Sequence, residues 1–166
     1  VNVTQELLRV SKGKGRPPLW LQEVPGHDPN TLAYIGLNVC YDTVIYNQTL
    51  TSALIAIGTR VEQERWALEL ENKDKVLFKR LVAQVTKNHT SERYRLKAAK
   101  VIAAKEGFSI PKWSKQQKLS IASPILNAVL EGTNIFQVST DTVEMKTMRH
   151  ITLTPEAAEM VRQRSF

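Results

Sequence analysis

Hydrophobic residues recur at helical spacing along most of this chain, and that periodicity stops after Gly132. Leu50, Leu54, Ile57 and Val61 follow one another at intervals of four, three and four residues, as they would on one face of an α-helix. Beyond Gly132 the spacing becomes that of short strands. The sequence therefore predicts a mainly α fold, a helical domain with one β-hairpin near the C-terminus.

Breaks in the periodic pattern set the expected helix boundaries. Helices are predicted over about 30–45, 49–71, 91–106 and 113–130, and one more carries Leu77, Leu81 and Val85. Pro124 should kink or interrupt the helix over 113–130. A last helix should begin at Thr154-Pro155-Glu156, where a capping threonine precedes a proline at the first helical position.

The predicted hairpin covers about 133–153. Its strands are Ile135–Val138 and Thr147–Leu153, and the polar run 139–142 is the predicted turn between them. An apolar residue exposed at the apex of such a hairpin can enter between DNA base steps and unstack them. An Ile-Phe pair such as Ile135-Phe136 can instead pack on its own core, and the residues alone leave both interpretations open.

Positive charge is concentrated in one third of the chain. The formal net charge is +7, but residues 73–118 hold thirteen Lys and Arg against three acidic side chains, so the other residues are slightly acidic. This asymmetry is typical of a face that binds a polyanion, and it also fits a solvated helix surface. A second basic group, Lys12, Lys14 and Arg16, lies in a glycine-bearing loop that could enter an A·T-rich minor groove or be a basic linker.

Groups that could carry out catalysis are scarce. His27, His89 and His150 have no metal-binding spacing, and no phosphate-binding glycine loop is present. The single cysteine, Cys40, lies in an apolar stretch and is expected to be a small buried hydrophobe. No apolar run approaches the ~18–20 residues of a membrane span. We therefore expect no catalytic residue, no metal site and no membrane partner for this chain.

Several short segments, taken in order, resemble the N-terminal domain of bacteriophage-type single-subunit DNA-directed RNA polymerases. Each is moderately specific, and their order and spacing carry the resemblance. They are Arg16-Pro17, Leu21–Val24, Leu32–Ile35, Ala56–Glu64, Trp113–Lys115, Leu119–Ala122, Leu130–Thr133 and Ile151–Glu156.

The resemblance implies a function and a set of residues. Residues 1–166 would form one non-catalytic, promoter-binding domain of a larger polymerase, whose C-terminal domain holds the catalytic residues and their Mg²⁺. Lys12, Lys14 and Arg16 would read upstream A·T-rich DNA, and the basic region 73–118 would help line the RNA exit path. Ile135, Phe136 and Gln137 would belong to the promoter-opening hairpin. Phe136 would be the exposed wedge, and Ile135 is the second candidate for that role.

The partners that this resemblance implies are double-stranded promoter DNA, nascent RNA and the polymerase domain of the same chain, in the cytoplasm of an infected bacterium. Two alternatives stay open. The chain could be a free-standing basic helical DNA-binding or adaptor protein, or it could come from an organellar polymerase of the same family.

Overall fold

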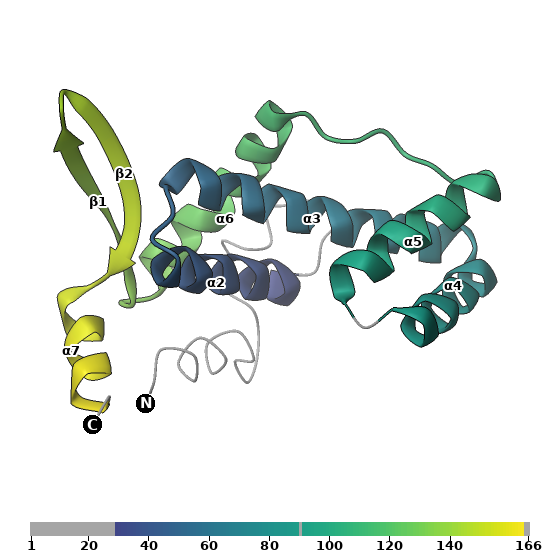
Figure 1. Cartoon of the computed structure of the whole chain (residues 1–166), viewed down its shortest axis with the longest axis horizontal. Coiled ribbons are helices and arrows are strands. Elements are labelled where there is room, and N and C mark those ends of the chain that lie inside the picture. The colour runs from purple at the N-terminus through teal and green to yellow at the C-terminus, as the bar shows by residue number, and fades with distance from the viewer. Residues whose placement is uncertain (1–28, 90, 165–166) are drawn as a thin grey trace. The chain divides into compact units, whose positions relative to one another are not determined.

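The computed structural model of the chain describes residues 29–89 and 91–164. Within them the chain forms six helices and one two-stranded antiparallel hairpin (Figure 1), which confirms the mainly α prediction. The elements in order are α2 (Pro29–Ile45), α3 (Leu50–Lys73), α4 (Lys75–Asn88), α5 (Glu92–Lys105), α6 (Lys115–Gly132), β1 (Phe136–Val143), β2 (Lys146–Leu153) and α7 (Pro155–Arg164).

Local side chains explain where several helices begin. Ser114 and Gln117 form a reciprocal capping box at the start of α6, and the Asp74 carboxylate accepts a hydrogen bond from the Leu77 amide at the start of α4. Thr154 precedes α7, and its hydroxyl accepts a bond from the Ala157 amide. Pro124 does not interrupt α6, which runs on as one helix to Gly132.

The chain divides into two compact units. The first contains α2, α3 up to Val61, and everything from Trp113 onward; the second is Glu62–Lys112. In the first unit, α6 packs tightly against α2 and α3 because glycines face it. A Cβ atom on Gly58 would lie 2.6 Å from the Lys118 carbonyl oxygen, and one on Gly36 would lie 2.8 Å from a Val129 methyl group.

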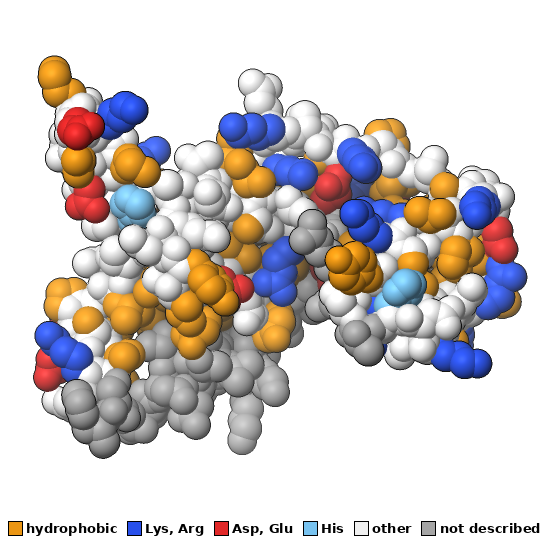
Figure 2. Space-filling view, viewed as in Figure 1, with side chains coloured by type: hydrophobic (Ala, Val, Ile, Leu, Met, Phe, Trp, Pro, Cys, Tyr) orange, Lys and Arg blue, Asp and Glu red, His pale blue; other side chains and the backbone are white. Residues whose placement is uncertain are grey.

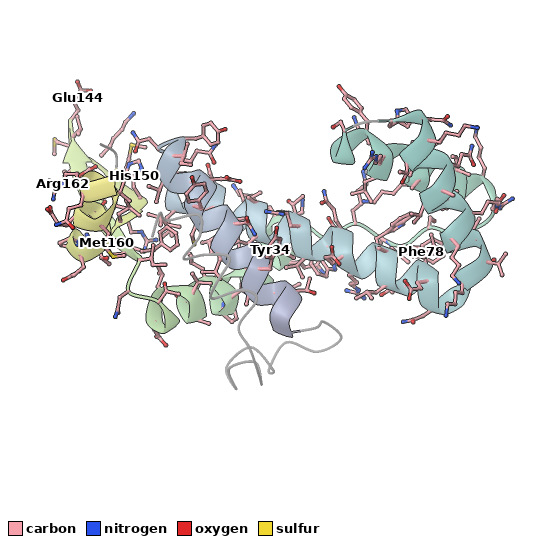
Figure 3. All side chains as sticks on the ribbon, turned by 90° about the horizontal axis from the view of Figure 1, so that it is seen from below. Tyr34, Phe78, Glu144, His150, Met160 and Arg162 are labelled. Carbon is pink, nitrogen blue, oxygen red and sulfur yellow. The ribbon has the colours of Figure 1, made fainter. Side chains whose placement is uncertain are left out.

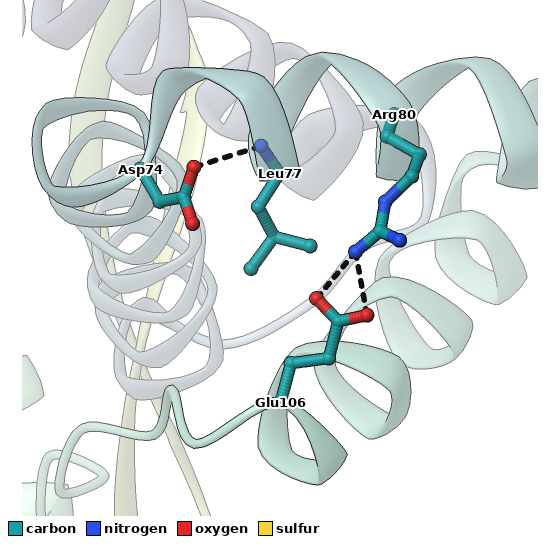
Figure 4. Close-up of polar contacts among 4 residues, drawn as sticks. All are labelled: Asp74, Leu77, Arg80 and Glu106. Atoms are coloured by element: carbon teal, nitrogen blue, oxygen red, sulfur yellow. Dashed lines mark hydrogen bonds and ion pairs between the residues drawn. The ribbon is translucent and has the colours of Figure 1, made fainter.

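The second unit has a core of its own. One face of α4 carries Leu77, Leu81 and Val85, and these pack with Trp66, Leu70, Ala99, Ala103 and Phe108. The rings of Trp66 and Phe108 meet edge to face, with centroids 5.9 Å apart. Arg80 on α4 holds the carboxylate of Glu106, just after α5, through two hydrogen bonds (Figure 4). This exposed pair joins the two helices at their surface.

The hairpin differs from the prediction in where it turns. Its strands pair from Phe136 with Leu153 to Val143 with Lys146, which leaves only Glu144 and Met145 in the loop. The predicted turn at 139–142 is therefore wrong, since those residues lie in β1. Threonine is β-branched and suits a strand, so the polarity of that run did not indicate a loop.

Candidate nucleic-acid interface

The base of the hairpin is fixed in the core of the first unit. Phe136 and Ile151 are each 2% exposed, and Ile135 beside them is 8% exposed. The Ile135 carbonyl accepts a hydrogen bond from the Thr154 amide at 2.9 Å. On the other edge, His150 forms an isolated bridge with Thr49, and its Nδ1 lies 3.3 Å from the Gln48 carbonyl oxygen. Both strands therefore leave the core in a defined direction.

This burial corrects the predicted wedge. Phe136 was expected to be exposed, and Ile135 to be the next candidate, but both side chains lie in the core. The reason is the register, which places Phe136 at the first pair of the hairpin, farthest from the turn. Gln137 points away from the core and is exposed, but it too lies at the base.

The apex carries the exposed hydrophobic side chains instead. Met145 is 98% exposed and Val143 is 67% exposed, and Met148 on β2 is 46% exposed. These residues were not predicted from the sequence, because the predicted turn at 139–142 lies too early in the chain. Equal pairing of the two strands across 136–153 puts the midpoint between Glu144 and Met145, and that symmetry could have identified the apex.

The backbone at the apex adopts a conformation that glycine and asparagine favour. Both loop residues have positive φ, 51° at Glu144 and 65° at Met145, as in the two-residue turns that match strand twist. Neither residue is Asn or Gly, and a non-glycine residue in this region costs about 1–2 kcal/mol. The turn is therefore less stable than an Asn-Gly turn would be, and in exchange it presents a large apolar side chain.

The outer part of the hairpin stands clear of the core. Every residue from Thr140 to Arg149 is exposed. Four residue pairs lie in this part, and at about 3.4 Å per residue they extend roughly 10–14 Å. Figure 2 shows hydrophobic side chains at the far end of the hairpin, and Figure 3 labels Glu144 there and His150 nearer the base. The dimensions are those of a narrow pin with an apolar tip.

The second unit supplies the basic surface. Helix α4 contains no acidic residue, and its lysines are exposed. The exposed Lys side chains from α3 to the end of this unit are Lys73, Lys75, Lys79, Lys87, Lys97, Lys105 and Lys112. Tyr94, on the same helix as Lys97 and Lys105, is 60% exposed. Such a surface can contact phosphates, and aromatic side chains of this kind can stack on bases.

The other basic group, Lys12, Lys14 and Arg16, lies outside the described residues.

The described residues contain few groups suited to other chemistry. Burial raises the pKa of the Cys40 thiol to about 12, so at neutral pH it is a protonated core residue rather than a nucleophile. Within residues 29–89 and 91–164, no three His, Cys, Asp or Glu side chains are grouped as a metal site requires. None of the described helices has both the length and the apolarity needed to cross a bilayer.

Comparison of the chain with protein-family models and with curated proteins found no match.

Proposed function

We propose that this chain is the non-catalytic, promoter-opening domain of a single-subunit DNA-directed RNA polymerase of the phage type. In this proposal the hairpin formed by β1 and β2 inserts its apex into duplex DNA and separates base pairs. The basic side chains elsewhere in the chain hold the phosphates while this occurs.

The observation that carries the proposal is the exposed apolar apex. An isolated exposed Met needs no explanation, but here Met145 and Val143 lie at the end of a long pin whose base is locked in a core. The turn also tolerates two non-glycine residues at positive φ to present them. Strain retained at a surface apex is typical of functional positions.

The energetics of unstacking fit an apolar wedge. Unstacking one base step costs a few kcal/mol, and proteins that do so insert Phe, Leu, Ile, Met or Pro between the two base pairs. Burying a Met side chain contributes about 1.5–3 kcal/mol. Burial of Met145 together with the nearby Val143 can therefore offset most of the free energy of unstacking one base step. Phosphate contacts must supply the remainder.

The other parts of the proposal rest on the resemblance. Lys12, Lys14 and Arg16 would read upstream A·T-rich DNA through the minor groove, and the region 73–118 would help line the path of nascent RNA. Nucleotide addition and its Mg²⁺ would belong to the C-terminal domain of the parent polymerase. The site of action would be the cytoplasm of the infected bacterial host.

A free-standing basic DNA-binding or adaptor protein is the second candidate, and the acid-free surface of α4 favours it. Such a protein would hold intact duplex through its phosphates and would have no need of an apolar pin. Preference for opened over closed DNA therefore separates the two candidates.

The test replaces the wedge without weakening the turn. Met145→Asn removes the apolar side chain, and Asn tolerates positive φ better than Met does, so the hairpin should stay folded. The wild-type chain should bind a duplex with a mismatched bubble about ten-fold more tightly than the closed duplex, because the unstacking energy is no longer needed. Met145→Asn should reduce this preference to about two-fold or less. Competition binding by fluorescence anisotropy measures both.

The matched control is Met160→Gln, which changes an exposed Met on α7, the helix that follows the base of the hairpin rather than its apex, and should keep the wild-type preference. A wild-type chain that binds both DNAs equally would contradict the proposal, as would a Met145→Asn chain that keeps the full preference.

A further inference from the structure

The two faces of the hairpin exchange character between base and apex. Side chains of a residue pair share one face, and successive pairs alternate between faces. The face that packs on the core carries Phe136 with Leu153 and then Ile151, whose partner Val138 is already 38% exposed. Farther out, the same face carries Thr140 with Arg149 and then Thr142 with Thr147, so it becomes polar as it leaves the core.

The opposite face changes the other way. At the base it carries polar pairs, Gln137 with Thr152 and Ser139 with His150. Toward the apex its pairs are Asp141 with Met148 and Val143 with Lys146. Val143 and Met148 are diagonal neighbours, about 7–8 Å apart and within reach of each other's side chains. Both side chains are exposed, so this face presents an apolar patch to solvent beside the apex.

We propose that the hairpin keeps two kinds of DNA contact on opposite faces. The face of Thr140, Thr142, Thr147 and Arg149 binds the phosphodiester backbone of one separated strand. The face of Val143 and Met148 lies against the unstacked bases at the fork. This inference rests on the proposed function and specifies how the same hairpin holds the strands apart.

Charge decides which face takes the phosphates. Arg149 is exposed and makes no ion pair in the described part of the chain, and the two outer pairs of its face, Thr140 with Arg149 and Thr142 with Thr147, include no acidic residue. The opposite face holds the Asp141 carboxylate, which repels a phosphate. The single positive charge of Lys146 on that face only cancels the charge of Asp141, so these pairs carry no net positive charge. Arg guanidinium and Thr hydroxyl groups are common phosphate donors in protein–DNA contacts.

Strand propensity does not produce this division. Threonine and valine both suit strands, and propensity alone has no preference for one face of a pin that is exposed on both sides. Yet all three threonines of the outer hairpin lie with Arg149, and both apolar side chains of its strands lie opposite. A hairpin with a hydrogen-bonding face and an apolar face can contact the phosphates of one separated strand and the unstacked bases on its other side.

The experiment uses forked DNA, a duplex with two unpaired arms, in which neutral methylphosphonate linkages replace the first phosphates of one arm at a time. The wild-type chain should lose about ten-fold in affinity when one particular arm is neutralised, the scale of a hydrogen bond to a charged group. It should be unaffected by neutralisation of the other arm. Arg149→Gln should lose a similar factor on natural DNA and nothing further on the neutralised arm.

Two further variants separate the faces. The double variant Thr142→Val, Thr147→Val keeps the β-branched shape, so the hairpin should stay folded although the two hydroxyl groups are lost. The loss of affinity on neutralising the same DNA arm should then become smaller. Lys146→Gln removes a charge from the opposite face and should leave the dependence on that arm intact. Three results would overturn the assignment. The first is an equal loss of affinity on both arms, and the second is a loss from Arg149→Gln that adds to the loss from methylphosphonate. The third is a Lys146→Gln chain that behaves like Arg149→Gln.

Failure of this inference can be told apart from failure of the proposed function. If Met145→Asn abolishes the preference for opened DNA while neither arm shows the Arg149 coupling, the pin opens DNA but does not hold a strand by this face. If Met145→Asn has no effect on that preference, the proposed function itself is wrong.

Discussion

Phe136→Ala should lower the free energy of unfolding of the first unit by ~3–5 kcal/mol, the usual loss for a buried Phe. The side chain is 2% exposed and packs in the core that α2, α3 and α6 share with the base of the hairpin. Truncation removes apolar contact and leaves a cavity that a well-packed core closes only in part. Hydrogen exchange of α2 and α6 amides measures this loss separately from the second unit, which has its own core.

The neighbouring residue is the matched control for this variant. Gln137 is exposed on the opposite face of the same strand, so Gln137→Ala should change stability by less than about 0.5 kcal/mol. If Phe136→Ala were as stable as Gln137→Ala, the register of the hairpin and the correction to the predicted wedge would both be wrong.

Gly58→Ala is expected to cost ~1–3 kcal/mol, although alanine favours a helix over glycine by about 1 kcal/mol. The added Cβ would lie 2.6 Å from both the Cβ and the carbonyl oxygen of Lys118, so α3 and α6 would have to move apart. Because the obstacle includes backbone atoms, no change of rotamer relieves it. Chemical denaturation followed by circular dichroism gives the change in unfolding free energy.

Gly36→Ala is the comparison that tests this cause. Its added Cβ would meet methyl groups of Val129 and Ile125 at 2.8 and 3.0 Å, and side chains can yield more readily than backbone. Gly36→Ala should therefore be the milder change. A stabilised Gly58→Ala chain would show that helix propensity outweighs the contact and that α3 and α6 are not packed this closely.

The helices could be predicted from the sequence because their signals are local. Leu77, Leu81 and Val85 mark the buried face of α4 by spacing alone, and Thr154-Pro155-Glu156 marks the start of α7. The division into two units could not be predicted in this way. It depends on which apolar faces meet, such as the contact of Trp66 with Phe108 across the second unit.

The candidate site was predicted only in outline. The hairpin was expected near its observed position, but the exposure of a strand residue depends on the register, and the register depends on a turn that Glu144-Met145 does not signal. Moving the turn from 139–142 to this pair puts Phe136 in the core. It also makes Val143 and Met145 the exposed apolar residues.

If Met145 enters between two base pairs, a neighbouring base loses its stacking, and this loss can be measured directly. The fluorescent base analogue aminopurine, placed within an A·T-rich step of a closed duplex, is quenched while stacked and brightens when a neighbour is displaced. At saturating protein, the wild-type chain should raise its fluorescence, and Met145→Asn should bind the same duplex but leave the analogue quenched. No rise with the wild-type chain, or an equal rise with Met145→Asn, would contradict the account.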